Sequence, residues 1–272
     1  MQISLDFGIT VTDALLKKAE GEIEHRSLLS EEGPKDKIIK NIFKDLDFKQ
    51  VESIAVTGGR HEDIANDING IKIIHVNEVQ AIGEGAMYLS GLPNNKGSII
   101  VNSGSGTSCI YSKNGDYFHC SGTGVGGGTV LGLSKLLLGT TDPDEINELA
   151  SNGDERNVDL IIEDVVSGPI GQLPSDTTAV NFGKIAKNKD TVSREDIAAG
   201  IVNLVGQTAA RIATSVAFAY EVSDIIVVGR TPTFKSLRES LEKAALLTNF
   251  NPHFPENGHY ASALGAMLIA EK

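Results

Sequence analysis

The chain has 272 residues, 40% of them hydrophobic and 22% charged, which suits a globular protein of one large or two ordinary domains. Its net charge of −12 argues against a nucleic-acid partner, because phosphate backbones are bound by basic surfaces. No stretch reaches the roughly 18 apolar residues of a membrane span, and residues 1–6 lack the pattern of a signal peptide. Cys109 and Cys120 have no metal-ligand spacing and are expected to be small, reduced core residues. We therefore expect a cytoplasmic protein with neither a nucleic-acid nor a membrane partner.

The N-terminal third predicts strands mixed with helices. Residues 3–6 form a short apolar strand, and residues 11–28 predict two further strands of an antiparallel meander with a turn near Gly21. Apolar residues at helical spacing predict a helix over residues 35–46. A buried strand that ends in a glycine turn is expected at residues 53–59. We expect a short helix, a strand and a helix rich in small residues at residues 61–68, 71–76 and 78–92.

The order of a strand, a glycine turn and a strand then recurs. It occurs first at residues 3–17 and again at residues 98–111, with a hairpin expected about Asn114 and Gly115. The two stretches share no obvious sequence repeat, yet their layout is duplicated. This duplication predicts a two-lobed α/β protein with its ligand between the lobes.

The remainder of the chain is predicted to be mostly helical. Asp142 and Pro143 are a good helix start, because the aspartate can cap and the proline fits the first helical position. Ser193 begins a capping-box-like sequence that leads into a long helix ending near Tyr220. We expect a strand into a glycine turn, a helix, and the opening of a final small-residue helix at residues 224–229, 232–247 and 256–266.

Two runs of glycine and other small residues, at residues 101–108 and 121–133, stand out. Each glycine costs backbone entropy on folding, and the usual gain is close approach of the backbone to another group. The second run leads into an apparent helix at residues 133–138, so its glycines would lie at a helix N-terminus, where free amides and the dipole favour anions. One run alone would suggest a flexible loop or turns, but two in series favour phosphate binding.

A further motif, Asp-x-Gly-x-Thr, follows the first strand at Asp6, Gly8 and Thr10. A carboxylate at a strand end can hold a hydrated magnesium ion. The glycine permits a turn close to phosphate, and the threonine offers a hydroxyl and an amide to phosphate oxygens. An ordinary turn would have the same composition, so this motif gains meaning only together with the two later runs.

Three such strand-to-glycine turns, at residues 6–10, 104–107 and 228–230, look like those of the actin-like/hexokinase ATPase superfamily. The glycine-rich middle, Asn102-x-Gly104-x-Gly106-Thr107-Ser108 followed by Gly122-x-Gly124-x-Gly126-Gly127-Gly128, resembles the type II (eukaryote-like) pantothenate kinases. The resemblance covers nearly the whole chain in order. Further matches are Gly153-Asp154, Asp159, Ala179-Val180-Asn181-Phe182-Gly183, Glu256-Asn257-Gly258 and Gly265-Ala266.

The resemblance implies an α/β, two-lobed actin-like ATPase (ribonuclease H-like) fold with a nucleotide cleft between the lobes. It implies an N-terminal lobe of residues 1–94 plus 258–272 and a C-terminal lobe of residues 95–257. It also implies a homodimer, for which the apolar helix at residues 201–220 is our expected interface.

The implied activity is ATP-dependent phosphorylation of pantothenate to 4'-phosphopantothenate, the first step of coenzyme A biosynthesis, with ATP and Mg²⁺ as cofactors. In the family a carboxylate that opens a helix of the form Glu-(x)6-Gly deprotonates the substrate hydroxyl, and Glu78 to Gly85 fits that form. Glu84 is the reserve candidate, and an ordinary acidic helix start is the alternative for Glu78. Nucleotide binding is assigned to Asp6, Gly8, Thr10, Ser105, Gly106, Thr107, Gly126, Gly127, Gly128, Gly229 and Arg230, metal binding to Asp6, and substrate binding to Ser105, His119 and Gly122.

The chain departs from the family pattern at three positions. Ile9 replaces a glycine, Asp13 replaces a lysine, and His119 replaces an arginine that precedes the second glycine loop. Losing two cations matters, because cations offset the charge that moves during phosphoryl transfer. An inward-facing Asp13 would repel phosphate, so one interpretation has it facing away on the second strand. Arg230, where the family has serine, would supply a compensating cation, and His119 could still donate a hydrogen bond to substrate.

These departures leave three hypotheses. The first is a kinase for pantothenate or a near relative such as pantetheine. The second is a catalytically impaired homologue that binds nucleotide or acyl-coenzyme A as a sensor, with acyl-coenzyme A a candidate regulator also of an active enzyme. The third is another kinase or an activator ATPase of the superfamily. The third ranks last, because Cys109 and Cys120 do not resemble the iron–sulfur pattern of the activators.

Overall fold

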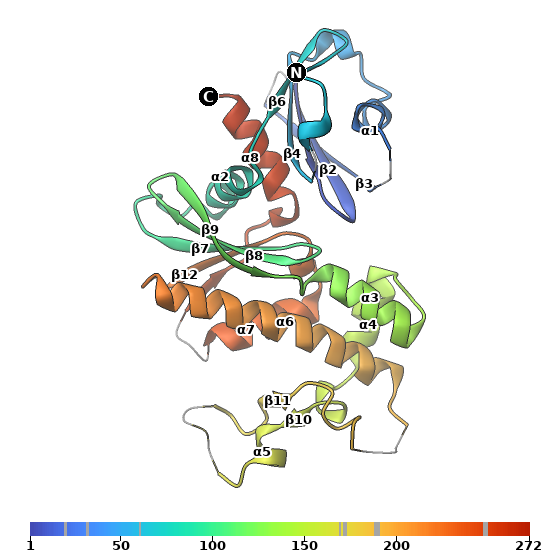
Figure 1. Ribbon diagram of the computed structural model, residues 1–272, viewed down its shortest axis with the longest axis vertical. Coiled ribbons are helices and arrows are strands. Elements are labelled where there is room, and N and C mark those ends of the chain that lie inside the picture. The colour runs from blue at the N-terminus through green and yellow to red at the C-terminus, as the bar shows by residue number, and fades with distance from the viewer. Residues whose placement is uncertain are drawn as a thin grey trace.

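The computed structural model describes residues 1–18, 21–30, 33–59, 61–168, 170, 173–187, 191–246 and 250–272. Two β-sheets lie one above the other, and a pair of crossing helices lies between them (Figure 1). Each sheet is covered by further helices on the side away from this pair. The duplicated α/β layout expected from the sequence is therefore present.

The first sheet is built from the N-terminal residues, in the order β3-β2-β1-β4-β6-β5. The expected meander is confirmed: β1 pairs antiparallel with β2, and β2 pairs antiparallel with β3, while β4 runs parallel to β1. Helix α1 covers one face, and the other face receives the C-terminal helix α8. The bounds are β1 (Gln2–Phe7), β2 (Val11–Lys17), β3 (Ile23–Leu29), β4 (Ser53–Gly58), β5 (Asp67–Ile68), β6 (Ile71–His75) and α1 (Lys35–Ile42).

The second sheet has the order β13-β12-β7-β8-β9. Its central strand is apolar on both faces: Ile99 and Val101 pack in the core beneath α6, and Ile100 packs with α2 on the opposite face. The expected hairpin between β8 and β9 is confirmed, with Asn114 and Gly115 in the left-handed conformation at φ 55° and 83°. The bounds are β7 (Ser98–Ser103), β8 (Thr107–Lys113), β9 (Asp116–Thr123), β12 (Asp224–Val228) and β13 (Asn251–His253).

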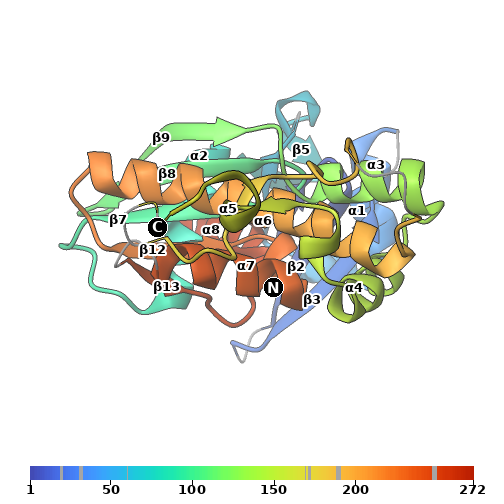
Figure 2. The same cartoon turned by 90° about the horizontal axis from the view of Figure 1, so that it is seen from below.

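Helices of the C-terminal half cover the outer face of the second sheet. The longest, α6 (Arg194–Ala219), begins as predicted, with the Ser193 hydroxyl accepting the Asp196 amide at 3.0 Å. The predicted start of α4 is also confirmed, since the Asp142 carboxylate accepts two amides of its first turn. A small segment packs on the far side of α6 from the sheet (Figures 1 and 2). The bounds are α3 (Gly127–Leu138), α4 (Pro143–Asn152), α7 (Lys235–Leu246) and, in the small segment, β10 (Leu160–Ile161), α5 (Ile162–Val165) and β11 (Thr178–Val180).

Two predicted helices differ from the structure. The short helix expected at residues 61–68 is wrong: a single 3-10 turn, His61–Asp63, precedes strand β5. The left-handed pair Asn69 and Gly70 turns the chain so that β5 pairs with β6. The helix expected from residue 232 begins at Lys235, after a 3-10 turn that contains Pro232 (bounds Thr231–Thr233). Its predicted last residue, Leu247, lies outside the described residues, as does Glu20 in the predicted turn near Gly21.

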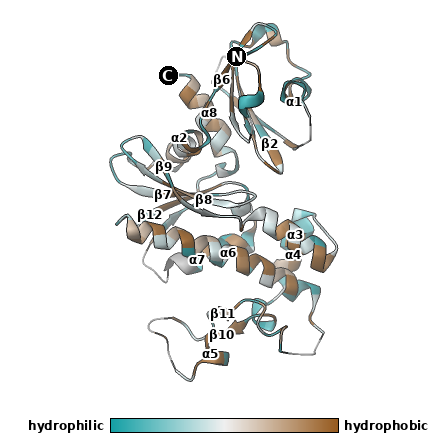
Figure 3. Ribbon diagram, in the orientation of Figure 1, coloured by the Kyte–Doolittle hydropathy of each residue, from teal (hydrophilic) through white to brown (hydrophobic). Residues whose placement is uncertain are grey.

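The two crossing helices, α2 (Glu78–Ser90) and α8 (Ala261–Ala270), join the sheets. Helix α2 packs on the core of the second sheet, whereas α8 packs on the first sheet (Figure 1). Figure 3 shows the hydrophobic character of α8, most of whose residues are buried. At the crossing, a Cβ on Gly85 would overlap the carbonyl oxygen of Ala261, and a Cβ on Gly265 would overlap that of Ala81. The backbones of the two helices therefore touch, and only glycine fits at both positions.

This crossing gives a first prediction. The Gly85→Ala variant should lose about 3 kcal/mol of unfolding free energy, because neither backbone can move without displacing one sheet from the other. Gly132→Ala, at an exposed position of α3, is the control: its Cβ would meet open space, so the better helix propensity of alanine should hold or raise stability. Thermal unfolding monitored by circular dichroism measures both. Equal midpoints for the two variants would contradict the close crossing.

Candidate active site

The three predicted glycine turns meet between the two sheets. Thr10, after β1, and Ser105, after β7, come from opposite sheets, and their hydroxyl oxygens lie 2.9 Å apart. The turn after β12 contacts the same region, since the Thr231 hydroxyl donates to the Ser103 carbonyl at 2.6 Å. Gly229 makes this turn at φ 94°, where a Cβ would lie 2.5 Å from the Ser103 carbonyl oxygen. The convergence of these turns defines the candidate site.

The glycines of the second run lie at a helix N-terminus, as predicted, but α3 begins at Gly127 rather than at the expected residue 133, and amides of its first turn are already used. The amide of Gly127 donates to the Gly104 carbonyl at 2.8 Å, and that of Gly128 donates to the Ser105 carbonyl at 2.9 Å. A Cβ on Gly126 would lie 2.7 Å from the backbone of Gly106. The expectation that both runs present free amides is therefore wrong for these two donors. The glycines let the α3 start pack directly against the first loop.

Other amides, in the loops after β1 and β7, remain free to donate to a ligand. Within the described part of the chain, the amides of Thr10, Ser105 and Gly106 have no hydrogen-bond acceptor. The hydroxyl of Thr107 instead donates to the Val125 carbonyl at 2.9 Å, so Thr107 ties the first loop to the α3 start. The donors that remain for an anion are thus those nearest the contact between Thr10 and Ser105.

Asp6 lies at the end of β1, on the face of the sheet that receives α8. Its burial, together with the carboxylates of Glu78 and Asp13, raises its pKa to about 7, against the lowering effects of a Ser262 hydrogen bond and the Lys35 charge. Gly58, at φ 82°, makes room for this carboxylate, because a Cβ there would overlap Asp6 Oδ1. Crowded carboxylates with a raised pKa are a setting that a cation would relieve.

A magnesium ion fits this site as an ion held by one protein carboxylate. The described residues contain no group of three His, Cys, Asp or Glu side chains that could hold a metal. Mg²⁺ is commonly held by one or two carboxylates, with water and substrate phosphates as its other ligands. Asp6 alone is compatible with that mode, and the negative charge around it favours a divalent cation.

Glu78 is the first residue of α2, directly after Asn77, whose side chain accepts the amides of Val79 and Gln80. This cap fixes where the helix starts and thereby the position of Glu78. The Glu78 carboxylate is exposed, and its charge raises the pKa of Asp6. The reserve candidate Glu84 is engaged elsewhere: it accepts from the Tyr117 hydroxyl at 3.1 Å and from Lys272 Nζ at 2.7 Å. Of the two carboxylates, only Glu78 acts on the pKa of Asp6.

His119 and Gly122 lie on β9, at the edge of the second sheet. A Cβ on Gly122 would lie 2.9 Å from the Thr107 carbonyl oxygen and 3.5 Å from His119 Nε2. The strand therefore needs glycine there, next to the exposed histidine ring. No hydrogen bond joins His119 to the phosphate loops among the described residues, so its assignment to substrate stays a prediction.

Asp13 does not face away from the site. It pairs with Asp6 in the β1–β2 register, and directly opposed residues of a strand pair share one face. Its buried Oδ1 accepts from Arg230 at 2.6 Å and from His25 Nε2 at 2.7 Å. The interpretation of an outward Asp13 is wrong, and the contact with His25 was missed. The signal was present in the hairpin turn near Gly21, which makes residues 13 and 25 diagonal neighbours.

The rings of His259 and Tyr260 complete this corner. His25 lies 5.0 Å from the His259 ring and 4.9 Å from the Tyr260 ring, measured between centroids. Burial, followed by the nearby His25 and Arg230, lowers the pKa of His259. The lowered pKa favours the neutral form of the His259 ring, and Arg230 is the cation in contact with Asp13.

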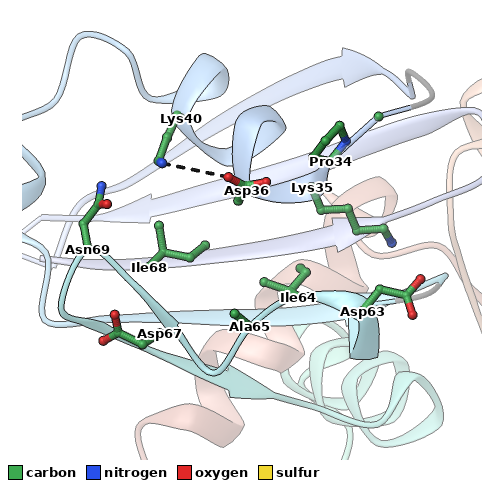
Figure 4. A pocket seen from close by; sticks show the side chains of 11 residues that line it. Pro34, Lys35, Asp36, Lys40, Asp63, Ile64, Ala65, Asp67, Ile68 and Asn69 are labelled. Carbon is green, nitrogen blue, oxygen red and sulfur yellow. Dashed lines mark ion pairs between the residues drawn. The ribbon is translucent and has the colours of Figure 1, made fainter.

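A separate hollow of about 870 Å³ lies in the N-terminal part, between α1 and residues 63–69 (Figure 4). None of the predicted site residues lines it. Lys40 and Asp36 form an ion pair on its wall at 3.9 Å. Lys35, also on its wall, donates to the Gly59 carbonyl and lies 4.4 Å from the centre of the Phe7 ring. This hollow is distinct from the convergence of glycine turns.

Solved structures with the same fold span almost the whole chain. Component A of (R)-2-hydroxyglutaryl-CoA dehydratase from Acidaminococcus fermentans superposes with a TM-score of 0.69 at 19% identity, covering 98% of this chain and 96% of that one. A ROK family glucokinase from Streptomyces griseus, in complex with glucose and AMPPNP, superposes with a TM-score of 0.62 at 13% identity, covering 98% of both chains. The fold is thus the two-lobed α/β fold of the actin-like ATPases.

Sequence comparison is more specific. The type II pantothenate kinase of Bacillus thuringiensis subsp. konkukian is 30% identical over 274 residues, which cover 98% of this chain and 97% of the relative. The type II pantothenate kinase of Oceanobacillus iheyensis is 32% identical over 224 residues, covering 79% of this chain and 81% of the relative. Residues 97–268 match the Fumble family. The chain therefore belongs to the Fumble family, together with the type II pantothenate kinases.

Proposed function

We propose that the protein transfers the terminal phosphoryl group of ATP to the 4'-hydroxyl of pantothenate, giving 4'-phosphopantothenate and ADP. The observation that carries this proposal is the match to type II pantothenate kinases over nearly the full length of both chains. The convergence of glycine turns from two lobes supports it, because phosphoryl transfer requires mainly positioning and charge neutralisation.

In this proposal the nucleotide lies between the lobes. The lobes themselves are taken as residues 1–94 plus 258–272 and residues 95–257, a division supported by the separation of the two sheets. The amides of Thr10, Ser105 and Gly106 bind phosphate oxygens, and Arg230 adds positive charge. The remaining nucleotide-binding residues keep these loops in place: Thr107 through its hydroxyl, and the glycines through close approach to backbone atoms, which for Gly8 is the carbonyl oxygen of Val11. They are Gly8, Thr107, Gly126, Gly127, Gly128 and Gly229.

Glu78 is proposed as the general base. Its carboxylate accepts the proton of the substrate hydroxyl as that oxygen forms a bond to the terminal phosphorus. The bond from this phosphorus to the bridging oxygen breaks, and ADP leaves with the electron pair. Asp6 would hold Mg²⁺, which when bound neutralises charge on the phosphates. Ser105, His119 and Gly122 are proposed to contact the substrate.

A second candidate function is suggested by Asp13, which lies on the same face as Asp6 and adds negative charge near it. An impaired homologue would bind nucleotide or acyl-coenzyme A without turnover, and an altered site could favour a relative such as pantetheine. ADP release should therefore be assayed with Mg²⁺-ATP and a panel of pantothenate, pantetheine and no acceptor. Pantothenate-dependent release supports the proposal. Release only with another acceptor, or ligand-induced stabilisation without release, would overturn it.

We also propose a homodimer in the cytoplasm, with the helix at residues 201–220 in the interface. Exposed aromatic side chains near the end of α6 support this interface, with Phe218 80% and Tyr220 42% accessible. Among the described residues, no helix is long and apolar enough to cross a membrane. A monomer in solution scattering would contradict the dimer, and acyl-coenzyme A added to the ADP assay tests regulation.

A further inference from the structure

An ion pair crosses from one lobe to the other beside the candidate site. Arg230, after β12, donates to Asp13 on β2 at 2.6 Å, although 217 positions separate them in the sequence. The Asp13 side chain is only 9% accessible, whereas that of Arg230 is 39% accessible. The carboxylate is thus the fixed partner, and the guanidinium is the partner that solvent or a ligand can reach.

The backbone on either side of Arg230 is held in place. The Gly229 amide donates to the Gly258 carbonyl at 2.9 Å. On the other side, the Thr231 hydroxyl donates to the carbonyls of Ser103 and Gly104 at 2.6 and 3.0 Å. Arg230 therefore starts from a point tied to the first phosphate loop, and its side chain alone crosses to the β1–β2 hairpin.

The anchor on the other side is equally fixed. His25, on the neighbouring strand β3, shares Asp13 Oδ1 with Arg230 and lies against the rings of His259 and Tyr260. One hydrogen bond from His25 already supplies this oxygen with a donor, so Arg230 is not needed simply to keep Asp13 from being unpaired. Because a second donor, Arg230, reaches the same atom from the other lobe, Asp13 is in place to position the Arg230 guanidinium.

The guanidinium retains most of its donors. It has five N–H groups, and one terminal nitrogen binds Asp13, whereas the other two nitrogens have no hydrogen-bonding partner in the described parts of the chain. These donors belong to a residue next to the loop that carries the unpaired amides of Ser105 and Gly106. A guanidinium held on one edge by a carboxylate can present its remaining donors to a phosphate in a fixed geometry.

We propose that Arg230 binds the terminal phosphate of the nucleotide, and that Asp13, held by His25, is the positioning residue that orients its guanidinium across the lobe boundary. This assignment rests on the proposed function for its kinetic effect, but not for its effect on nucleotide binding. It also gives the acidic Asp13 a role: its carboxylate binds the guanidinium of Arg230 and does not contact the phosphate.

The binding test compares two nucleotides. Titrations of the whole protein with Mg²⁺-AMPPNP and with Mg²⁺-ADP should separate the contribution of the terminal phosphate to binding from that of the rest of the nucleotide. Arg230→Gln should weaken AMPPNP binding by about tenfold or more and ADP binding by less than about twofold, since only AMPPNP has the phosphate that Arg230 binds. Equal weakening of both nucleotides, or of neither, would overturn the assignment. This arm needs no turnover, so it remains decisive even if pantothenate is not the acceptor.

The kinetic test isolates Asp13. Arg230→Gln should lower kcat for ADP release by about 10²-fold, and Asp13→Asn by roughly tenfold, with the KM for pantothenate unchanged. Arg230→Lys should recover only part of the loss, because it keeps the charge but lacks the planar fork. Arg156→Gln, which removes the arginine of an exposed Arg–Asp pair at 2.7 Å on the small segment, is the matched control and should keep wild-type kcat.

A double variant tests whether the positive charge can act from the other lobe. The double variant Asp13→Lys/Arg230→Gln places the cation on the opposite wall and should recover at least part of the kcat that Arg230→Gln loses. Unchanged kcat in Asp13→Asn would show that Arg230 works without Asp13 and would overturn the positioning role. Circular dichroism spectra and thermal midpoints close to wild type for Arg230→Gln ensure that its effect is not one of folding.

Discussion

The Glu78→Gln variant should lose about 10²- to 10⁴-fold in kcat, because the substrate hydroxyl would have no carboxylate to accept its proton. The amide keeps the size of the side chain and leaves the Asn77 cap intact, so α2 should still begin at the same residue. Binding of Mg²⁺-AMPPNP should be retained, since Glu78 is proposed to act on the acceptor and not on the nucleotide. ADP release and nucleotide titration measure the two effects separately.

Two further variants, and the stability of Glu78→Gln itself, show what a decrease in kcat would mean. If Glu78 served only to complement the helix dipole, Glu78→Gln would cost about 0.5 kcal/mol of stability and leave kcat unchanged. Glu84→Gln tests the reserve base, and a large fall in kcat there, with none in Glu78→Gln, would reverse the assignment. Glu163→Gln is the matched control, because Glu163 is an exposed glutamate in the first turn of α5, away from the phosphate loops.

Local signals made most of the fold predictable. The caps at Asp142 and Ser193, the turn at Asn114 and Gly115, and the apolar run of β7 are short-range features, and each appears where the sequence indicates it. Residues 61–68 were misassigned, because their short apolar spacing suits either a helix or a turn followed by a strand. The pairing of β5 with β6 decided between these through a tertiary contact.

The site was only partly predictable, for two physical reasons. A glycine signals close backbone approach, but not what approaches; at Gly127 and Gly128 the neighbour is the first loop itself. Long-range pairs carry no local signal either, so the ion pair between Asp13 and Arg230 follows only from the docking of the two lobes. The assignment of Glu78 rested on the resemblance to a family in which a carboxylate opens a helix of this form, and a helix start is a local feature of the sequence. This difference explains why that helix start could be predicted and the pairing of Asp13 with Arg230 could not, whereas the contact of Asp13 with His25 could have been inferred from the hairpin.

The Asp6→Asn variant should lose activity, by about 10³-fold or more, while making the metal-free protein more stable at neutral and alkaline pH. In the folded protein the pKa of Asp6 is raised from 3.8 to about 7. Between these values the folded state holds a proton that the unfolded state has lost, so the unfolding free energy of the wild type falls as pH rises. Asparagine carries no such proton. Its advantage should therefore be absent below pH 4, grow up to about pH 7 and then stay constant.

Thermal midpoints of both proteins from pH 4 to pH 9, without metal or nucleotide, measure this difference. Asp176→Asn, at an exposed aspartate, controls for the general loss of one negative charge. Mg²⁺-AMPPNP should raise the midpoint of the wild type far more than that of Asp6→Asn, because the ion would bind the carboxylate whose charge is otherwise unfavourable. An inactive variant without the pH-dependent advantage would mean that Asp6 is needed for activity but that its charge is not disfavoured by burial and by the carboxylates of Glu78 and Asp13. A fully active variant would remove Asp6 from the metal site altogether.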